Sequence, residues 1–205
     1  MKTLDFAESI KLAEKHGLPF VKSVEIKKES ELKKMRLRYP VALKAVSPKI
    51  LHKTEHNAVR VNLKNEKEVL SAFRQLKKLP AFKKAIAQEM ISGHELIIGA
   101  KKDPIFGHVI LVGFGGIFTE VMKDFSLRIA PIQKQDAVQM LSELKAFKLL
   151  KGYRGKKKAN IASIVSFIMK VNKMLEKEPW IKELDFNPVF ADEKKTQAVD
   201  VRIIG

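Results

Sequence analysis

Apolar and polar residues follow two different periods along the chain, and these periods predict a mixture of helices and strands. Apolar residues that recur every three to four positions are typical of helices with one buried face. Alternation, or short apolar runs bounded by glycine, proline or aspartate, predicts strands. The predicted helices are 5–16, 30–38, 65–76, 133–144 and 161–175. The predicted strands are 20–26, 41–46, 58–63, 85–90, 95–100, 108–112, 117–122, 127–131, 183–189 and 198–202.

The order of these elements favours an α+β (α/β) fold with two lobes. We expect a smaller N-terminal lobe over 1–84 and a larger C-terminal lobe over 85–205, joined near Gln88-Glu89-Met90. The chain has 205 residues, which is enough for one substantial core divided between two lobes. It contains no internal repeat and no low-complexity linker.

The last two predicted strands form a hairpin with an unusual set of polar residues. If Glu193 and Lys194 are at the centre of the turn, Asn187 lies opposite Asp200 and Asp185 lies opposite Arg202. The two-residue period of a strand then places all four side chains on one face. An amide oxygen and carboxylates can hold a magnesium ion that is also bound by phosphates. The alternative is that these residues form only the solvated face of a terminal hairpin.

A glycine-rich turn, Gly113-Phe114-Gly115-Gly116-Ile117-Phe118, joins two predicted strands. Without side chains, its backbone N–H groups can approach an anion closely. A plain hairpin turn explains the same residues, because the spacing matches neither the Rossmann fingerprint nor a P-loop.

Two basic residues occupy predicted strands. Lys44 lies in the apolar run Val41–Val46, where burial of an unpaired ammonium would be costly. It therefore either points into a cleft that holds negative charge or lies on an exposed edge. Arg128, in the run 126–131, poses the same alternative, and its guanidinium suits a phosphate.

His52 lies in a polar segment beside Lys53. A histidine flanked by lysine is usually a surface residue. Imidazole is also a competent phosphoryl acceptor, and the neighbouring ammonium would attract phosphate.

Composition narrows the class of protein. Hydrophobic residues make up 45% and charged residues 31%, as in soluble globular proteins. The absence of cysteine excludes disulfides, thiolate metal sites and cysteine nucleophiles. Because the sequence has neither an apolar run long enough to span a membrane nor the core of a signal peptide, we expect a cytoplasmic protein without membrane contact.

The net charge of +17 is compatible with nucleic acid, an anionic membrane or a polyphosphate ligand. Only seven of the 40 basic residues are arginine, and aromatic residues make up 7%. Base readout and stacking favour arginine and aromatic side chains. This composition therefore argues against specific nucleic-acid binding.

Taken together, these segments resemble the ATP-grasp β subunit, or β domain, of ADP-forming acetyl-CoA and acyl-CoA synthetases, which are related to succinyl-CoA synthetase. The resemblance runs in order from about residue 5 to the C-terminus. It depends on residues 39–44, 47–55, 88–90, 113–118, 128–131, 183–188 and 198–200.

This resemblance implies an ATP-grasp fold in which ATP or ADP and Mg²⁺ occupy a cleft between two lobes. It implies roles for ten positions besides His52. Phosphates would contact Lys44 and Arg128, and adenine would meet the backbone of Glu89 and Met90. Glu95 would lie near the nucleoside, and Gly115 and Gly116 would border the cleft. Asn187 and Asp200 would bind the metal, and Asp185 would lie beside the reacting phosphates.

The resemblance also implies the reaction and the partner. The chain would be an ADP-forming acid–CoA ligase of the acetate–CoA ligase type, active only with an α subunit, in an α₂β₂ assembly. The α subunit would carry the CoA-binding and phosphohistidine domains. His52 would relay the phosphoryl group from that phosphohistidine to ADP, yielding ATP from acyl-CoA, ADP and phosphate.

Two departures from the family pattern keep alternatives open. Asn57-Ala58 stands where relatives usually have two glycines, and a triple lysine, Lys156-Lys157-Lys158, follows Tyr153-Arg154-Gly155. The first departure allows a non-catalytic ATP/ADP-binding assembly subunit with the same fold. Charge alone motivates the third hypothesis, a basic nucleic-acid-binding module.

Overall fold

The computed structural model describes residues 3–47, 58–116, 123–155 and 157–205, and it has the predicted α+β character. The described chain divides into two compact units, Val21–Ile91 and the combination of Met1–Phe20 with Ser92–Gly205. This division differs from the expected lobes 1–84 and 85–205 at two places. The strand at 84–89 pairs inside the sheet of the smaller unit, and the first helix packs into the core of the larger unit.

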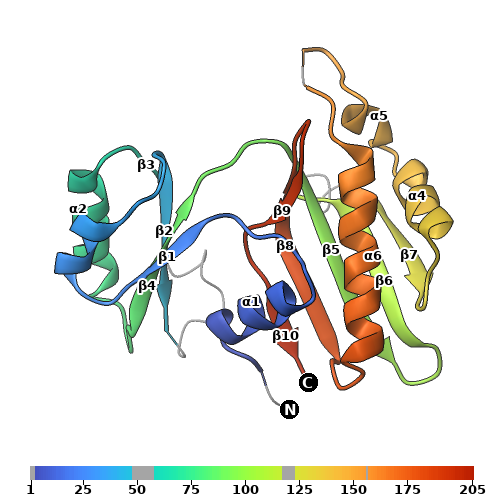
Figure 1. Cartoon of the computed structure of the whole chain (residues 1–205), viewed down its shortest axis with the longest axis horizontal. Helices are drawn as coiled ribbons and strands as arrows, with labels where there is room; N and C mark the ends of the chain where they lie inside the picture. Colours follow the sequence, from blue (N-terminus) through green and yellow to red (C-terminus); the bar gives the residue numbers. More distant parts are fainter. Residues whose placement is uncertain (1–2, 48–57, 117–122, 156) are drawn as a thin grey trace. The chain divides into compact units, whose positions relative to one another are not determined.

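The smaller unit is a four-stranded antiparallel sheet covered on one face by a helix (Figure 1). Its strands occur in the order β1-β4-β2-β3. Their bounds are Ser23–Ile26 for β1, Val41–Val46 for β2, Val59–Leu63 for β3 and Lys84–Glu89 for β4. The helix α2 (Glu66–Leu76) begins at Asn65, whose side chain accepts a hydrogen bond from the Glu68 N–H. Apolar residues of β2, β4 and α2 form one core.

The larger unit is built on a second antiparallel sheet, with the order β10-β8-β5-β6-β7 and with β9 paired to β8. The strands are β5 (His94–Asp103), β6 (Gly107–Phe114), β7 (Phe125–Ile129), β8 (Glu183–Ala191), β9 (Thr196–Ala198) and β10 (Arg202–Ile204). Figure 1 shows α4 (Lys134–Glu143) and α6 (Ile161–Lys177) over the same face of this sheet.

The helix-covered face of the larger sheet holds its hydrophobic core. Ile164, Phe167, Ile168 and Val171 of α6 are almost fully buried, together with alternate residues of β5, β6 and β8. These residues recur every three to four positions along α6, as expected for a helix with one buried face. The other face of the sheet carries the intervening residues, and we call it the open face.

Most predicted elements are confirmed, with one difference in helix type, one divided strand and one addition. The predicted helix over 30–38 is a 3₁₀ helix, Glu29–Lys34, and the predicted strand over 198–202 is divided between β9 and β10. A short helix, α5 (Phe147–Leu150), follows α4 and was not predicted. The predicted strand over 117–122 lies outside the described residues.

The first helix, α1 (Phe6–Lys15), is joined to the end of α6 by a polar contact. His16 Nε2 lies 2.9 Å from Glu178 Oε1, and Trp180 donates a hydrogen bond to Oε2 of the same carboxylate at 2.8 Å. These bonds, that of His16 first, hold the pKa of Glu178 below its ordinary value of 4.5, against the opposing effect of burial. The contact therefore fixes the N-terminal segment to the larger unit.

Replacement Glu178→Gln is expected to destabilise the protein at pH 7 but not at low pH. Because the folded-state pKa is lowered, the carboxylate stabilises the fold above pH 4.5, and this contribution is lost as the pH falls through the folded-state pKa. Urea denaturation at several pH values should show a wild-type advantage at pH 7 that shrinks below pH 4.5. A constant difference across this range would contradict the assignment.

Candidate functional site

The C-terminal hairpin has the register predicted from the sequence. Asp185 is the partner of Arg202, and further along the hairpin Val189 is the partner of Ala198. Between these pairs, the Val199 N–H donates to the Pro188 carbonyl at 3.0 Å. Because the register is the same on both sides of the interruption, Asn187 and Asp200 lie at the same level of the hairpin.

Strand β8 contains one extra residue relative to β5. Leu96 pairs with Val189 and Ile98 with Phe186, so that two steps on β5 correspond to three on β8. The bulge falls at Asn187-Pro188, where proline lacks the N–H of a regular ladder. As a result, Asp185 and Phe190 both lie on the open face, although their spacing is odd.

The carboxylate of Asp185 is partly buried and lies near charged groups of both signs. Burial raises its pKa above the ordinary value, and the charges of Asp200 and Glu183 act in the same direction, whereas Arg202 opposes the shift. Arg202 also forms an ion pair with Glu183 at 3.6 Å. A cation held between Asp185 and Asp200 would relieve this repulsion.

The donor set at this level fits a metal ion that is shared with a phosphate ligand. The described parts of the chain contain no cluster of three or more His, Asp or Glu that could hold a metal by itself. Asp185, Asp200 and the amide oxygen of Asn187 are hard oxygen donors of the kind that Mg²⁺ takes, and it usually completes its shell with water and substrate phosphates.

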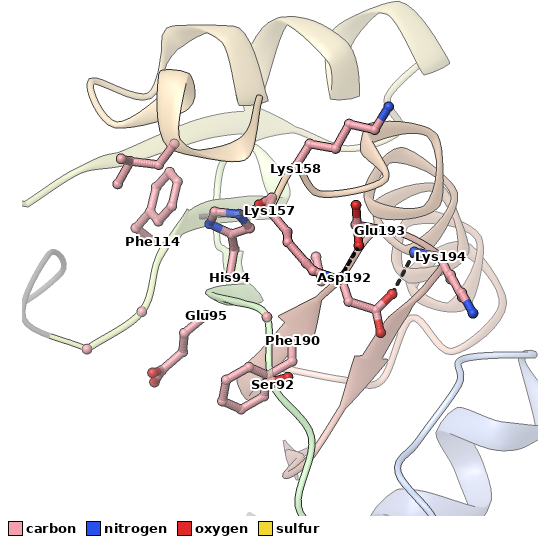
Figure 2. A pocket seen from close by; sticks show the side chains of 15 residues that line it. Ser92, His94, Glu95, Phe114, Lys157, Lys158, Phe190, Asp192, Glu193 and Lys194 are labelled. Carbon is pink, nitrogen blue, oxygen red and sulfur yellow. Dashed lines mark hydrogen bonds and ion pairs between the residues drawn. The ribbon is translucent and has the colours of Figure 1, made fainter. Parts of the chain in front are cut away.

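A hollow of about 880 Å³ lies at the other end of β8 (Figure 2). Its walls include Glu95 and Phe190, which are partners across β5 and β8. Gly115 and Gly116 also line it, and the Gly115 N–H donates to the Glu95 carbonyl at 2.8 Å. The family resemblance implied a nucleotide site that includes Glu95, Gly115 and Gly116, and the structure brings the three together.

The basic segment after Gly155 lies at the rim of this hollow. The carbonyl of Lys157 contacts His94 Nε2 at 2.7 Å, and its ammonium forms an ion pair with Glu193 at 2.9 Å (Figure 2). Lys158 and Lys194 line the same hollow. Figure 2 shows the ammonium groups of Lys158 and Lys194 pointing away from the hollow, so these two lysines contribute only to the positive charge around it.

The glycine at position 115 is required by a close contact. A Cβ atom there would lie 2.6 Å from Cγ of Glu95, far inside normal contact distance. Gly116 has φ +61°, a left-handed backbone conformation that glycine adopts without the steric cost that a side chain would add. The glycine-rich turn therefore does more than reverse the chain, because it leaves room for Glu95.

Replacement Gly115→Ala is expected to destabilise the protein by about 1–3 kcal/mol because of this overpacking. The double variant Gly115→Ala/Glu95→Ala removes the clashing atoms and should recover most of the stability in thermal denaturation. If Glu95 contacts the nucleotide, the double variant should still bind the nucleotide more weakly than the wild type does. An equal loss of stability in both variants would refute the steric explanation.

A second cavity, of about 700 Å³, lies on the open face beside Asp185. Gly99 is the partner of Asp185, and a Cβ at Gly99 would lie 2.8 Å from the Leu184 carbonyl oxygen. Sequence reasoning missed Gly99, although a glycine inside a predicted strand is a recognised signal of close backbone approach. It also missed Phe190, because the position of this residue in the strand does not by itself mark it as a binding residue.

Arg128 is not close to this set of residues. Its partner in β6 is Ile110, a core residue, and its guanidinium is bonded to Glu143 of α4 and to Ser126. The bond with Glu143 raises the pKa of Arg128 and lowers that of Glu143. Arg128 therefore lies on the helix-covered face, opposite the face of Asp185, and the predicted phosphate contact is not supported by this arrangement.

Of the predicted site residues that the structure describes, three lie in the smaller unit. Lys44 is buried in β2, which is an inner strand, so the edge-strand alternative is wrong. The backbone N–H of Glu89 donates to Lys22 and that of Met90 donates to Pro40. Adenine recognition by these two donors is therefore not supported, although the Met90 side chain is exposed. His52 and Asn57 lie outside the described residues.

Comparisons with known proteins identify the family. A family model described as an ATP-grasp domain matches residues 1–204. The chain belongs to the ATP-grasp family. Its fold is the ATP-grasp fold, as the resemblance implied.

Similar proteins include the beta subunit of one ligase and a longer ligase. The chain is 39% identical to the acetate–CoA ligase [ADP-forming] I subunit beta of Pyrococcus furiosus, over 96% of this chain and 89% of that one. It is 41% identical to the acetate–CoA ligase [ADP-forming] of Methanocaldococcus jannaschii, over 95% of this chain but 30% of that protein.

A solved structure of similar fold is acetyl-coenzyme A synthetase 1 of Ca. Korarchaeum cryptofilum in complex with coenzyme A and Ca-AMPCP. It has a TM-score of 0.91 and 35% identity, covering 99% of this chain and 93% of that one. Another structure of that enzyme, with a TM-score of 0.87, contains Mg-AMPPCP and a phosphohistidine segment pointing towards the nucleotide binding site.

Proposed function

We propose that this chain is the nucleotide-binding β subunit of an ADP-forming acyl-CoA synthetase. In this reaction acyl-CoA, ADP and phosphate yield the free acid, CoA and ATP. The observation that carries the proposal is the register of the C-terminal hairpin, which brings Asp185, Asn187 and Asp200 together in a chain of the ATP-grasp family. The ligases named above supply the class of reaction.

The nucleotide would extend along β8 on the open face. Phe190 and Glu95 would receive the nucleoside end, and Asp185 would lie near the terminal phosphates. Because of the bulge, the span between these two β8 residues is better read from their partners on β5, Glu95 and Gly99, which are four positions apart, or roughly 13 Å along a strand. The glycine turn at Gly115-Gly116 would let the backbone approach the ligand without side chains in between.

Asp185, Asn187 and Asp200 would hold Mg²⁺, which when bound neutralises phosphate charge and aligns the terminal phosphates. Asp185 would fix the position of that charge from the floor of the site. Lys44 is proposed to contribute a further positive charge to the phosphates. These groups act by electrostatic stabilisation, the main contribution of proteins to phosphoryl transfer.

The phosphoryl group would arrive on histidine and leave on ADP. A terminal oxygen of ADP attacks the phosphorus, the N–P bond of the phosphohistidine breaks, and the bonding pair returns to the imidazole nitrogen. His52 is proposed to be the relay that accepts the group from the partner's phosphohistidine and passes it on in the same way.

The partner would be an α subunit that carries the CoA-binding and phosphohistidine domains, in an α₂β₂ assembly in the cytoplasm. The name "subunit beta" of the Pyrococcus relative implies such a partner. In the Methanocaldococcus ligase the matching region covers 30% of a single chain. Among the described residues, none of the helices combines the length and apolar character needed to cross a membrane.

The proposal is tested by mixing the chain with the α subunit of the Pyrococcus furiosus ligase, acetyl-CoA, phosphate and Mg-ADP, and measuring ATP by luminescence. ATP that depends on both proteins is expected. Binding of Mg-ADP without any ATP would instead favour a non-catalytic nucleotide-binding subunit, and the absence of both would defeat the proposal.

A further inference from the structure

The edge strand β7 exposes its apolar side chains and turns its polar ones inward. Phe125, Leu127 and Ile129 are 43%, 47% and 52% exposed, whereas Ser126 is buried and Arg128 is bonded to Glu143 under α4. A half-buried strand normally shows the reverse pattern, with apolar residues towards the core. The sequence of β7 is therefore arranged for a contact on the open face that the described residues of the larger unit do not provide.

The exposed apolar surface continues to the turn between β5 and β6. Ile105 and Phe106 are 82% and 57% exposed, and their backbone N–H groups donate to Oδ1 of Asp103, which fixes the turn. We call the side chains of Ile105, Phe106, Phe125, Leu127 and Ile129 the β7 strip. They account for five of the eight large exposed apolar side chains in the described part of the larger unit. Such a concentration is typical of an interaction site.

The β7 strip is continuous with the cavity beside Asp185. Leu127 lines that cavity together with its partner Leu111, and Val109, the partner of Ile129, lines it as well. Apolar residues form its floor on this side, and Asp185 and Arg202 form its far wall. Any protein seated on the strip would therefore have direct access to the groups proposed to hold the terminal phosphates.

Strand β7 also offers a free backbone edge, since in the described residues it pairs with β6 alone. Edge strands of this kind add a strand from another chain or are covered by one. A surface with both an apolar face and an open edge can bind a partner through side chains and backbone together.

We propose that the β7 strip is the docking surface for the partner subunit of the synthetase, and this inference depends on the proposed function. The partner must deliver a phosphoryl group beside Asp185, and the strip leads directly to that residue. In the Methanocaldococcus ligase the region that matches this chain is joined to the remaining 70% or so of the same protein, so that domain has neighbours of the same polypeptide to contact. A second copy of this chain bound to the strip would not account for the delivery of a phosphoryl group beside Asp185.

The experiment measures binding of full-length variants to the α subunit of the Pyrococcus furiosus acetate–CoA ligase I. Ile129→Glu and Phe106→Glu each place a charge in the strip and are expected to raise the Kd at least tenfold in biolayer interferometry. The matched control is Val138→Glu, which alters an apolar side chain of similar exposure on α4, and it should stay within twofold of the wild type. Sedimentation of each protein alone reports self-association.

Several results would overturn the proposal. The first is that all three variants bind the α subunit with equal affinity, and the second is that the wild-type chain does not bind it. The third is that the wild-type chain forms a homodimer that Ile129→Glu dissociates. Calorimetric titration of each variant alone with Mg-ADP keeps this test separate from that of the proposed function. The three variants should bind Mg-ADP like the wild type, which also shows that they are folded. Failure of the wild-type chain to bind Mg-ADP would count against the nucleotide site and not against the docking surface.

Discussion

Replacement Asp200→Asn is expected to weaken the binding of Mg-ADP about 100-fold, which corresponds to about 2.7 kcal/mol. The substitution keeps the size of the side chain but removes one of the two carboxylates, Asp185 and Asp200, that the hairpin presents on its open face. The remaining donors, Asp185 and Asn187, would carry a single negative charge for the divalent ion. Isothermal titration calorimetry with ADP and excess Mg²⁺ measures the effect.

The metal dependence identifies the cause of this loss. The wild-type chain should bind ADP more weakly in EDTA than with Mg²⁺, whereas in Asp200→Asn the two affinities should become nearly equal. The control is Asp136→Asn, which removes the same charge at the start of α4, where the amide oxygen can still accept the hydrogen bond from the Gln133 N–H. If Asp200→Asn keeps the full magnesium effect, Asp200 is not a ligand.

Replacement Phe186→Ala is expected to destabilise the protein by about 3–5 kcal/mol. The side chain of Phe186 is fully buried, and its ring lies 5.3 Å from that of Phe167 and 6.1 Å from that of Phe20, measured between centroids. Truncation would leave a cavity where α6, β8 and the segment after α1 meet. The midpoint of urea denaturation, measured with and without Mg-ADP, reports the change.

Phe106→Ala provides the matched control, because it removes the same atoms from an exposed position. Its effect on stability should be within about 0.5 kcal/mol, as for other surface substitutions. Phe186 lies between Asp185 and Asn187 in β8, so its truncation should also disturb these two side chains. Phe186→Ala should therefore bind Mg-ADP more weakly than the wild type at denaturant concentrations where the variant is still folded. Equal stability of the two variants would contradict the core that the structure assigns to the larger unit.

The C-terminal hairpin shows how much of the site is determined locally. Its strands are consecutive and joined by a short turn, so the alternation of side chains and the position of Glu193-Lys194 were sufficient to predict the pairing of Asp185 with Arg202. The bulge at Asn187-Pro188 was not predicted, because it depends on the neighbouring strand β5, which is distant in the sequence. That bulge places Phe190 on the same face as Asp185.

The division into units could not be predicted from the order of elements. Strand β4 reads as the first strand of a second lobe, yet it pairs with β1 and β2. Helix α1 is amphipathic whichever lobe it joins, and its apolar face packs in the larger unit through Ala13 and its neighbours. Amphipathicity determines that a helix buries a face, but the partner is chosen by the packing of the whole molecule.

The sequence by itself determined the types of most elements and the register of the final hairpin, which sets Asn187 level with Asp200. These properties follow from the two- and 3.6-residue periods and from short turns, which act between residues close in the chain. Only the tertiary structure decided that Arg128 pairs with Glu143 under α4, that β2 is an inner strand around Lys44, and that the apolar side of β7 is exposed. Which face of a strand is buried depends on elements that pack against it from elsewhere in the sequence, and the alternation of residues within the strand carries no information about them.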